Sequence, residues 1–484
     1  MHRNPPPPAA AGVVRASGAS VASFAIGQGG RAALPAAPFS APPTALLTAL
    51  LTALLAAFFT LTPALTTAAG LNDIYQLARD NDAQLAAARQ TALAGQEREV
   101  QGRAGLLPNV ALSANLRQNR DRSTAYSGQQ GYESSNLALT ASQPLYRPAN
   151  RKTYEQGQLQ AQLATQQLQQ AEQQLRLRVA RGYFEVLQAE DALATLLSQK
   201  AAFAQQLAQA KRGYEVGLTP ITDVAEAQSR HDLTVAQGIA ARNDLELKRN
   251  ALEKSIRSAL PPLNPLAPSA SVELLSAEHL AQLRDGAGTS SLQVAAGVLA
   301  EQIARLEIDK QRTGHGPTVD LVFSASHNRN TNFGVFGGTD TSPASLGIEL
   351  NLPLYQGGAV DSRLREAAAN LGRTQSELDE ASRQAQLDAR QAMLGVQSGA
   401  ALTVALQQAI SSAETQVRAT SRGFEVGVRT RVDVLNAEQQ LYTTQRDLSA
   451  ARYQTLVAML QLRAAAGLLQ DDDLRNLDRL LQPR

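Results

Sequence analysis

The chain has 484 residues, a formal net charge of +2 and 18% charged residues. Because these charges are interspersed, the sequence excludes the basic surface that nucleic-acid binding requires. Cysteine is absent, which excludes disulfides, thiolate metal sites and a lipid-modified N-terminal cysteine, and the 4% aromatic content is typical of long alanine-rich helices rather than of a thick globular core.

Residues 1–69 are expected to form an N-terminal extension and a secretory signal. Residues 1–43 are rich in proline, alanine and glycine and lack apolar periodicity. An uncharged apolar run, Thr44–Thr62, follows and leads to the small residues Thr67, Ala68 and Ala69. This order predicts a signal peptide that is cleaved after Ala69. A retained membrane anchor is the alternative, because the run is just long enough to span a bilayer.

The next region combines one helix with segments of period two. Helical periodicity runs from Leu71 to about Arg103. Apolar residues then alternate with small or polar residues over 110–116, 137–144, 319–325 and 346–352, and the intervening polar segments 118–135 and 326–344 are expected to be loops.

Each alternating segment suits a strand of about ten residues, the length that crosses a bilayer within a barrel. An ordinary antiparallel sheet half-covered by helices is the alternative, and the pattern leaves both open. Four strands are too few to enclose a water-filled lumen, so the membrane interpretation requires an oligomer.

Long helical stretches follow the strands in pairs. The first begins after Pro148 and continues for about sixty residues, and it is followed by 224–258; the second pair covers 360–422 and 434–467. Leucine and valine recur at spacings of three, four and seven. Each pair therefore predicts a coiled-coil helical hairpin.

A repeated twelve-residue phrase marks both turns. It reads Gly-Tyr-Glu-Val-Gly-Leu-Thr-Pro-Ile-Thr-Asp-Val from Gly213 and Gly-Phe-Glu-Val-Gly-Val-Arg-Thr-Arg-Val-Asp-Val from Gly423. Gly217 and Gly427 suit the break between two helices, and Asp223 and Asp433 suit the N-cap or first turn of the returning helix. Two Pro-Leu-Tyr phrases mark the strand-helix junctions, at Pro144, Tyr146, Pro353 and Tyr355.

These phrases recur in the same order, which predicts a tandem structural repeat. The expected fold class is α+β with mostly long α-helices, each repeat holding two membrane β-strands and a coiled-coil helical hairpin. The expected domains are the extension and signal (1–69), a first repeat (70–260), a connecting segment (261–288), a second repeat (289–467) and a C-terminal tail (468–484).

The sequence contains no pattern typical of catalysis, of a cofactor or of a metal site. The five histidines are scattered without ligand spacing. The run Asp471–Asp473 lacks the spacing of a calcium loop, so a solvated helix start is expected there. No nucleophile elbow is present. We therefore predict that the chain is not an enzyme.

The Gly-Tyr-Glu-Val-Gly and Gly-Phe-Glu-Val-Gly phrases, the Pro-Leu-Tyr pairs and their duplication resemble the TolC family of outer-membrane efflux proteins. The resemblance covers about 71–467. It implies a homotrimer in which each chain contributes four strands to a twelve-stranded β-barrel in outer-membrane lipid, above an α-helical tunnel in the periplasm. It implies a passive exit duct for a tripartite efflux pump or a type I secretion system, opened at its periplasmic end by an adaptor protein and an inner-membrane ABC or RND transporter.

The resemblance also implies a gate at the two hairpin turns. Arg429 should face Thr222 and Asp223 of the neighbouring hairpin, and a ring of Asp433 carboxylates at the narrowest point should favour cations. Helix capping is the alternative role for Asp223 and Asp433. Two positions depart from the family pattern. Phe424, which matches Tyr214 of the first repeat, stands where a tyrosine is usual. Asn436 stands where a second acid is usual.

Two other functional classes compete with a duct. A structural or adhesive coiled-coil protein, periplasmic or at the surface, would use the hairpins without a pore. A periplasmic adaptor would carry one hairpin flanked by lipoyl-like segments, whereas this hairpin is duplicated. The sequence does not predict whether the exported cargo is a drug, a metabolite or a protein.

Overall fold

A computed structural model describes residues 68–122, 129–267, 276–331 and 337–482. The chain divides into two compact units, Met1–Leu65 and Thr66–Arg484, and all described residues belong to the second. The expected extension and the apolar run Thr44–Thr62 lie outside the described residues. None of the helices in the described part of the chain is long and apolar enough to cross a membrane.

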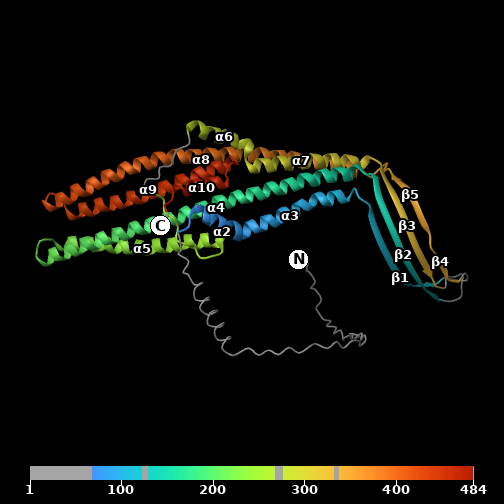
Figure 1. Ribbon diagram of the computed structural model, residues 1–484, viewed down its shortest axis with the longest axis horizontal. Coiled ribbons are helices and arrows are strands. Elements are labelled where there is room, and N and C mark those ends of the chain that lie inside the picture. Colours follow the sequence, from blue (N-terminus) through green and yellow to red (C-terminus); the bar gives the residue numbers. More distant parts are fainter. Residues whose placement is uncertain (1–67, 123–128, 268–275, 332–336, 483–484) are drawn as a thin grey trace, which may run out of the picture. The chain divides into compact units, whose positions relative to one another are not determined.

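Two helical hairpins dominate the second unit. The first consists of α4 (Pro148–Glu215) and α5 (Ile221–Ile256), and the second of α8 (Ala359–Glu425) and α9 (Arg431–Ala465). Figure 1 shows each pair lying side by side, with the strands at the ends of α4 and α8 that are far from the turns. The expected bounds 224–258, 360–422 and 434–467 are correct to within about three residues, whereas α4 has 68 residues instead of the expected sixty or so.

Shorter helices pack along the hairpins. They are α2 (Leu71–Asn81), α3 (Ala83–Ala104), α6 (Ala277–Ser290), α7 (Leu292–Arg312) and α10 (Asp471–Asp478), with a 3₁₀ turn η1 at Thr313–His315. The single helix expected from Leu71 to Arg103 is interrupted at Asp82. The Asp82 carboxylate accepts a hydrogen bond from the Leu85 N–H at 2.8 Å and so caps α3.

The strands form one antiparallel sheet in the order β1, β2, β3, with β4 and β5 both paired to β3. Their bounds are Asn109–Arg122 (β1), Gln129–Tyr146 (β2), Thr318–Asn330 (β3), Thr339–Thr341 (β4) and Ala344–Asn351 (β5). The segments 118–135 and 326–344 were expected to be loops, but β1, β2 and β3 continue into them. Side chains there are polar on both faces, so the alternation that marks a strand is missing while backbone pairing continues.

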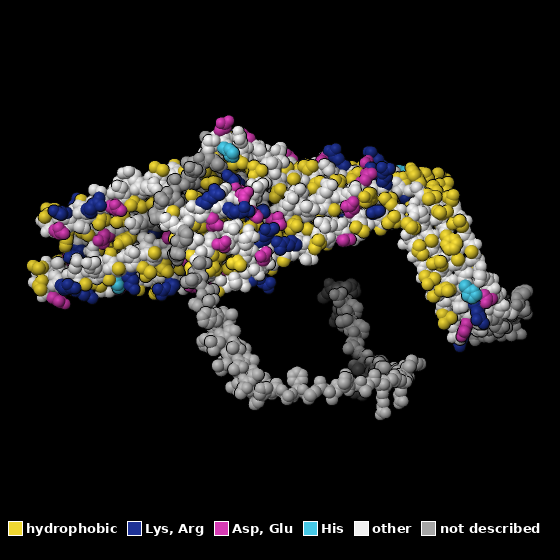
Figure 2. Space-filling view, viewed as in Figure 1, with side chains coloured by type: hydrophobic (Ala, Val, Ile, Leu, Met, Phe, Trp, Pro, Cys, Tyr) yellow, Lys and Arg dark blue, Asp and Glu magenta, His cyan; other side chains and the backbone are white. Residues whose placement is uncertain are grey.

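The register gives the sheet two different faces. Rows of paired residues such as Leu112, Leu139 and Ala325 place apolar side chains on one face. The neighbouring rows, such as Thr140, Ser324 and Ser345, place small or polar side chains on the other. Figure 2 shows hydrophobic side chains gathered over the strands. The expected apolar and polar faces are therefore present.

The main hydrophobic core lies where α2, α4, α5, α9 and α10 meet. Tyr183 and Phe184 of α4 are fully buried, and the Phe184 ring stacks on Tyr453 of α9 at 6.0 Å between centroids. The Tyr183 hydroxyl donates to the carbonyl oxygens of Ala69, at 3.2 Å, and Asn264, at 2.9 Å. One side chain thus joins the start of the described chain to the segment after α5.

The C-terminal tail is tied into this core. The expected solvated helix start at Asp471–Asp473 does begin α10, but of its three acids only Asp472 is exposed. Asp471 lies 2.6 Å from the Arg176 guanidinium, and Asp473 is buried and paired with Arg463. These partners lie on α4 and α9, and the sequence pattern of the acidic run contains no sign of them.

Replacing Tyr183 by Phe should lower the free energy of unfolding by about 1–2 kcal/mol, because two buried carbonyl oxygens lose a donor. Chemical denaturation followed by circular dichroism would measure the change. Tyr154→Phe is the matched control, because the half-buried Tyr154 hydroxyl contacts only side chains: it donates to Glu99 at 3.4 Å and accepts from Gln158 at 3.0 Å. Equal losses in the two variants would contradict the structural role of Tyr183.

Candidate functional site

The two hairpin tips, defined as residues 213–223 and 423–433, share one backbone design. Gly217 and Gly427 adopt φ angles of +74° and +80°. The N–H of Leu218 donates to the Gly213 carbonyl at 2.7 Å, as that of Val428 does to Gly423 at 2.9 Å. This is the Schellman arrangement that ends a helix with glycine in the left-handed region.

The first glycine of each phrase is needed for a different reason. A Cβ atom at Gly213 would lie 2.8 Å from the Thr219 hydroxyl, and one at Gly423 would lie 2.7 Å from Cγ of Arg429. The chain leaving the turn therefore crosses directly over these positions. The spacing Gly-x-x-x-Gly in both phrases follows from one close approach and one positive φ.

The two predicted acids have different surroundings. Asp433 forms a capping box with Thr430, since its carboxylate accepts from the Thr430 N–H at 2.9 Å and its own N–H donates to the Thr430 hydroxyl at 3.2 Å. The Thr430 N–H and hydroxyl both donate to this carboxylate and, with the charge of Arg429, hold the pKa of Asp433 below its usual value. Asp223 lies in the first turn of α5, whose N-cap is Pro220, and its side chain does not cap the helix.

Arg431 is the cation nearest to Asp223. Its Nε lies 3.9 Å from the Asp223 carboxylate, and its guanidinium lies 4.6 Å from the centroid of the Phe424 ring. The side chain is only 7% exposed, and Nε has no hydrogen-bond partner. A buried guanidinium thus joins the end of α8 to the start of α5 by an ion pair and a cation–π contact.

Arg429 does not make the contact expected of it within one chain. It is exposed, and the ion pairs of the described residues do not include it. Thr222 and Tyr214 are exposed as well. Contact of Arg429 with Thr222 and Asp223 therefore stays a prediction for the interface between neighbouring chains.

A row of polar contacts continues from the tips between the two hairpins. We call this row the inter-hairpin seam: Arg230 donates to Asn436 at 3.1 Å, Gln206 to Glu438 at 2.8 Å, Gln199 to Gln439 at 2.6 Å, and Tyr453 to Asp191 at 2.8 Å. Asn436, expected at a constriction, is the seam partner of Arg230. The other seam residues were not singled out from the sequence.

Burial perturbs two titratable groups of the seam, Tyr453 and, nearer the tips, Glu438. Burial raises the pKa of the Glu438 carboxyl group, and the hydrogen bond from Gln206 only partly opposes this rise. One carboxylate oxygen, Oε2, is buried without a hydrogen-bond partner. The ionised form is therefore disfavoured in the folded chain.

Several apolar side chains at the two hairpin tips are exposed to water. Val216, Leu218 and Ile221 on the first tip are 56–82% exposed, and Val426 and Val428 on the second are 70% and 75% exposed. Exposed apolar side chains concentrated on two adjacent turns are typical of a binding surface.

The strand-helix junctions lie at the other end of the hairpins. Pro144 pairs with Asp320 and Tyr146 with Val319, so β2 carries a bulge at Leu145, a position at which proline is tolerated. Arg147 then donates to both carboxylate oxygens of Asp320, at 2.7 and 2.6 Å. At the second junction, Pro353 and Tyr355 precede Gly357 and Gly358, which have φ angles of +62° and +79°. Both junction tyrosines are exposed.

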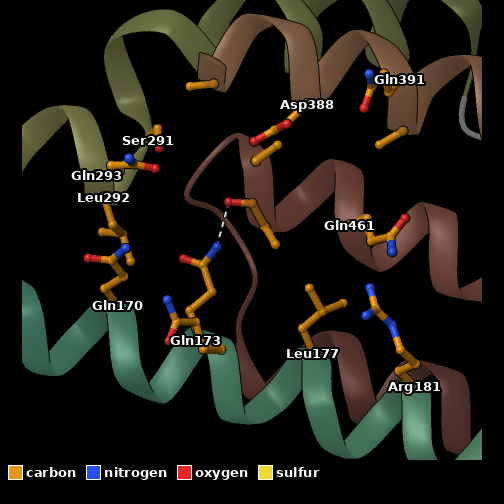
Figure 3. A pocket seen from close by; sticks show the side chains of 15 residues that line it. Gln170, Gln173, Leu177, Arg181, Ser291, Leu292, Gln293, Asp388, Gln391 and Gln461 are labelled. Atoms are coloured by element: carbon orange, nitrogen blue, oxygen red, sulfur yellow. Dashed lines mark hydrogen bonds between the residues drawn. The ribbon is translucent and has the colours of Figure 1, made fainter. Parts of the chain in front are cut away.

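A polar cavity of about 470 Å³ lies between α4, α7, α8 and α9. Figure 3 shows amide side chains around it, with Gln173 donating to the Ala464 carbonyl. Its charged lining residues are Arg181 and Asp388. It has no paired nucleophile and base, and within the described ranges no group of His, Asp and Glu could hold a metal ion. The cavity offers hydrogen bonds but no catalytic chemistry.

Substituting the turn glycines should destabilise the chain. Gly217→Ala and Gly427→Ala should each lower the free energy of unfolding by about 1 kcal/mol, because alanine resists positive φ. Gly372→Ala is the matched control: Gly372 lies inside α8 with open space around its Cβ position, so alanine should stabilise by up to about 1 kcal/mol. Urea unfolding would measure all three, and the same sign at all positions would contradict the analysis.

Stability should depend on pH through Glu438. Because the folded chain favours the protonated form, this group stabilises fully below its unfolded pKa, and that contribution is lost as the pH rises through the raised folded pKa. Glu438→Gln mimics the protonated form. It should raise the melting temperature at pH 7 but not at pH 4, whereas the exposed control Glu215→Gln should do neither. An equal gain at both pH values would refute the proposed burial effect.

Comparison with known proteins agrees with this architecture. The family model for outer membrane efflux proteins matches residues 74–256 and 283–468. The chain is 33% identical to the proteases secretion protein PrtF of Dickeya chrysanthemi, over 86% of this chain and 92% of that protein. It is also 33% identical to the outer membrane protein TolC of Vibrio cholerae, over 85% of this chain and 93% of that one.

Solved structures share the fold at lower identity. The Neisseria gonorrhoeae MtrE outer membrane channel in its open state matches with a TM-score of 0.70 and 20% identity, covering 83% of this chain and 90% of that one. The Vibrio cholerae outer membrane protein VceC matches with a TM-score of 0.69 and 19% identity, covering 82% and 96%. The predicted resemblance to the TolC family is confirmed. The chain belongs to the outer membrane efflux protein family, whose members are non-enzymatic channels of the outer membrane that extend into the periplasm.

Proposed function

We propose that three copies of this chain form a passive exit duct for a tripartite efflux pump or a type I secretion system. The open sheet is the observation that carries this proposal. Its outer strands, β1 and β5, each pair on one side only, so both edges present unpaired backbone groups. In a membrane such edges must be satisfied by another strand. β4 and β5 pair with successive parts of β3 and count as one interrupted strand, so each chain supplies four strands. Three such sheets joined edge to edge would close a twelve-stranded β-barrel.

The two faces of the sheet support the same assembly. Leu112, Leu346 and Ile348 on the apolar face are 69–70% exposed, which suits contact with outer-membrane lipid. The opposite face, with Thr140, Ser324 and Asn328, suits a hydrated lumen. The hairpins of three chains would continue this lumen as an α-helical tunnel through the periplasm.

The domain division proposed for this duct follows the repeated element order. A helix, strands and a helical hairpin occur in 70–260 and again in 289–467. The segment 261–288 connects these two repeats, 468–484 forms the tail, and the extension and signal precede the first repeat. Because the two repeats are similar, one chain would supply two similar helical hairpins to the tunnel wall.

The partners proposed for this chain dock at the hairpin tips. The exposed valine, leucine and isoleucine side chains there suit the apolar part of a periplasmic adaptor, which an inner-membrane ABC or RND transporter would accompany. PrtF and AprF are named for protease secretion and BepC for efflux, which supports both classes of cargo route. A non-pore coiled-coil scaffold remains the alternative function.

The proposed gate combines contacts within and between chains. Arg431 holds Asp223 within one chain, and the exposed Arg429 would reach Thr222 and Asp223 of the next chain. Three Asp433 carboxylates, already ionised because their pKa is low, would favour cations at the narrowest point. Tyr214 and Phe424 would flank the turns beside Asn436.

Single-channel recording in planar bilayers tests the duct and its gate. The wild type should carry a small, cation-preferring current. Asp223→Asn removes the negative charge that both arginines would face, so the closed-state current should rise several-fold. Asp232→Asn is the matched control, because Asp232 lies on the same helix but bonds only to Gln228 and His231. The Asp232 variant should behave as wild type.

The outcomes separate the duct from the gate. Absence of current in the wild type and both variants, with no heat-resistant oligomer in outer-membrane extracts, would favour the scaffold and exclude the duct. A normal current that Asp223→Asn leaves unchanged would keep the duct and exclude the gate at Asp223. Arg429→Ser and Arg431→Gln recorded separately would then divide the gate between its contact across chains and its contact within one chain.

A further inference from the structure

We propose that the mature chain begins at Ala69, so that the signal is removed by hydrolysis of the Ala68–Ala69 peptide bond. This is one bond upstream of the site that the sequence pattern favours. The sequence alone distinguishes the two bonds poorly. Cleavage after Ala68 has Thr66 three residues before the bond, cleavage after Ala69 has Thr67, and both leave alanine at the cut.

Ala69 is part of the folded structure. Its N–H donates to the Pro262 carbonyl at 2.8 Å, and its carbonyl accepts from the Asn264 N–H at 3.1 Å, so it forms a parallel β-bridge with Leu263. The Tyr183 hydroxyl also donates to the Ala69 carbonyl. Ala69 is only 9% exposed, whereas Ala68 is half-buried. Among the described residues, which start at Ala68, burial and pairing therefore begin at residue 69.

The residues just after Ala69 are held with equal closeness. The Asp478 carboxylate of α10 accepts from the N–H groups of Leu71, at 2.5 Å, and Asn72, at 2.9 Å. A Cβ atom at Gly70 would lie 2.7 Å from Oδ1 of Asp478. The Asp73 carboxylate accepts from the Gly70 N–H at 3.1 Å. The segment just after Ala69 is thus packed against the C-terminal tail, with the Asp73 and Asp478 carboxylates near it.

Cleavage at each bond leaves a different mature structure. Hydrolysis of Ala68–Ala69 by water gives the Ala68 carboxylate and an Ala69 ammonium group. That ammonium still donates to Pro262, and it lies near the Asp73 and Asp478 carboxylates, whose negative charges attract it. Hydrolysis of Ala69–Gly70 would remove Ala69 and, with it, the hydrogen bonds to the Pro262 carbonyl and from the Asn264 N–H. The enzyme implied is a membrane-bound peptidase that selects small residues.

Terminal mass spectrometry tests the proposal. The full chain is expressed in a Gram-negative host, extracted from the outer membrane, labelled on free amines and digested after arginine. The labelled N-terminal peptide should be Ala69–Arg79. Gly70–Arg79, which is lighter by one alanine, would overturn the proposal, as would an unprocessed N-terminus.

A second measurement tests the structural reason. The native residues 1–68 or 1–69 are replaced by a leader of known cleavage, so that the mature chain starts at Ala69 or at Gly70. The form starting at Ala69 should melt at the temperature of the native protein, and Ala69→Ser in that form should too, since it keeps both backbone groups. The form starting at Gly70 should melt several degrees lower. Equal melting of the two forms would overturn the role of Ala69.

Discussion

Close packing of very long antiparallel helices is the constraint on which the structure depends. A helix of 68 residues such as α4 spans on the order of 100 Å and cannot be stabilised by one local core. Alanine supplies close approach along its length, at Ala164, Ala180, Ala189 and Ala210, and α8 does the same with Ala385, Ala389 and Ala392. Large buried side chains gather mainly where α2, α10 and the segment after α5 cover α4 and α9. The low aromatic content follows from this distribution.

Local features of the fold could be predicted because each has a local cause. The hairpin turns follow from glycines that either adopt positive φ or lie under the chain, and both requirements are visible in one short phrase. The apolar strand faces follow from alternation. The strand ends could not be predicted, since at Asn119 and Arg120 pairing continues without alternation. The break at Asp82 was missed because a cap inside a helical pattern resembles an ordinary polar position.

The side-chain partners at the tips were harder to predict, because they join residues about 200 positions apart. Family resemblance directed attention to Arg429, while the buried cation beside Asp223 is Arg431, two residues further along the same turn. The sequence alone left capping open for both acids, and the structure assigns it to Asp433 but not to Asp223. The contacts of the seam glutamines could not be predicted, since periodicity shows which positions are apolar but not which polar side chains lie against each other.

The contact between the two hairpins changes in character along its length. Near the core it is apolar, with Phe184 stacked on Tyr453 and with Leu456 and Leu460 buried. Toward the tips it becomes the seam, in which Gln199, Gln206 and Arg230 meet amide and carboxyl groups. Within the first hairpin, an apolar cluster persists near the tip, at Leu207, Ala210 and Ala227.

Water can replace a polar side-chain contact at a net cost of about 1 kcal/mol, whereas exposing an apolar side chain costs about 1.5–3 kcal/mol. Separation is therefore least costly at the tips and between hairpins, and most costly near the core and within the first hairpin. A partner bound to the exposed valines and leucines of the tips would therefore act where the two hairpins separate most easily.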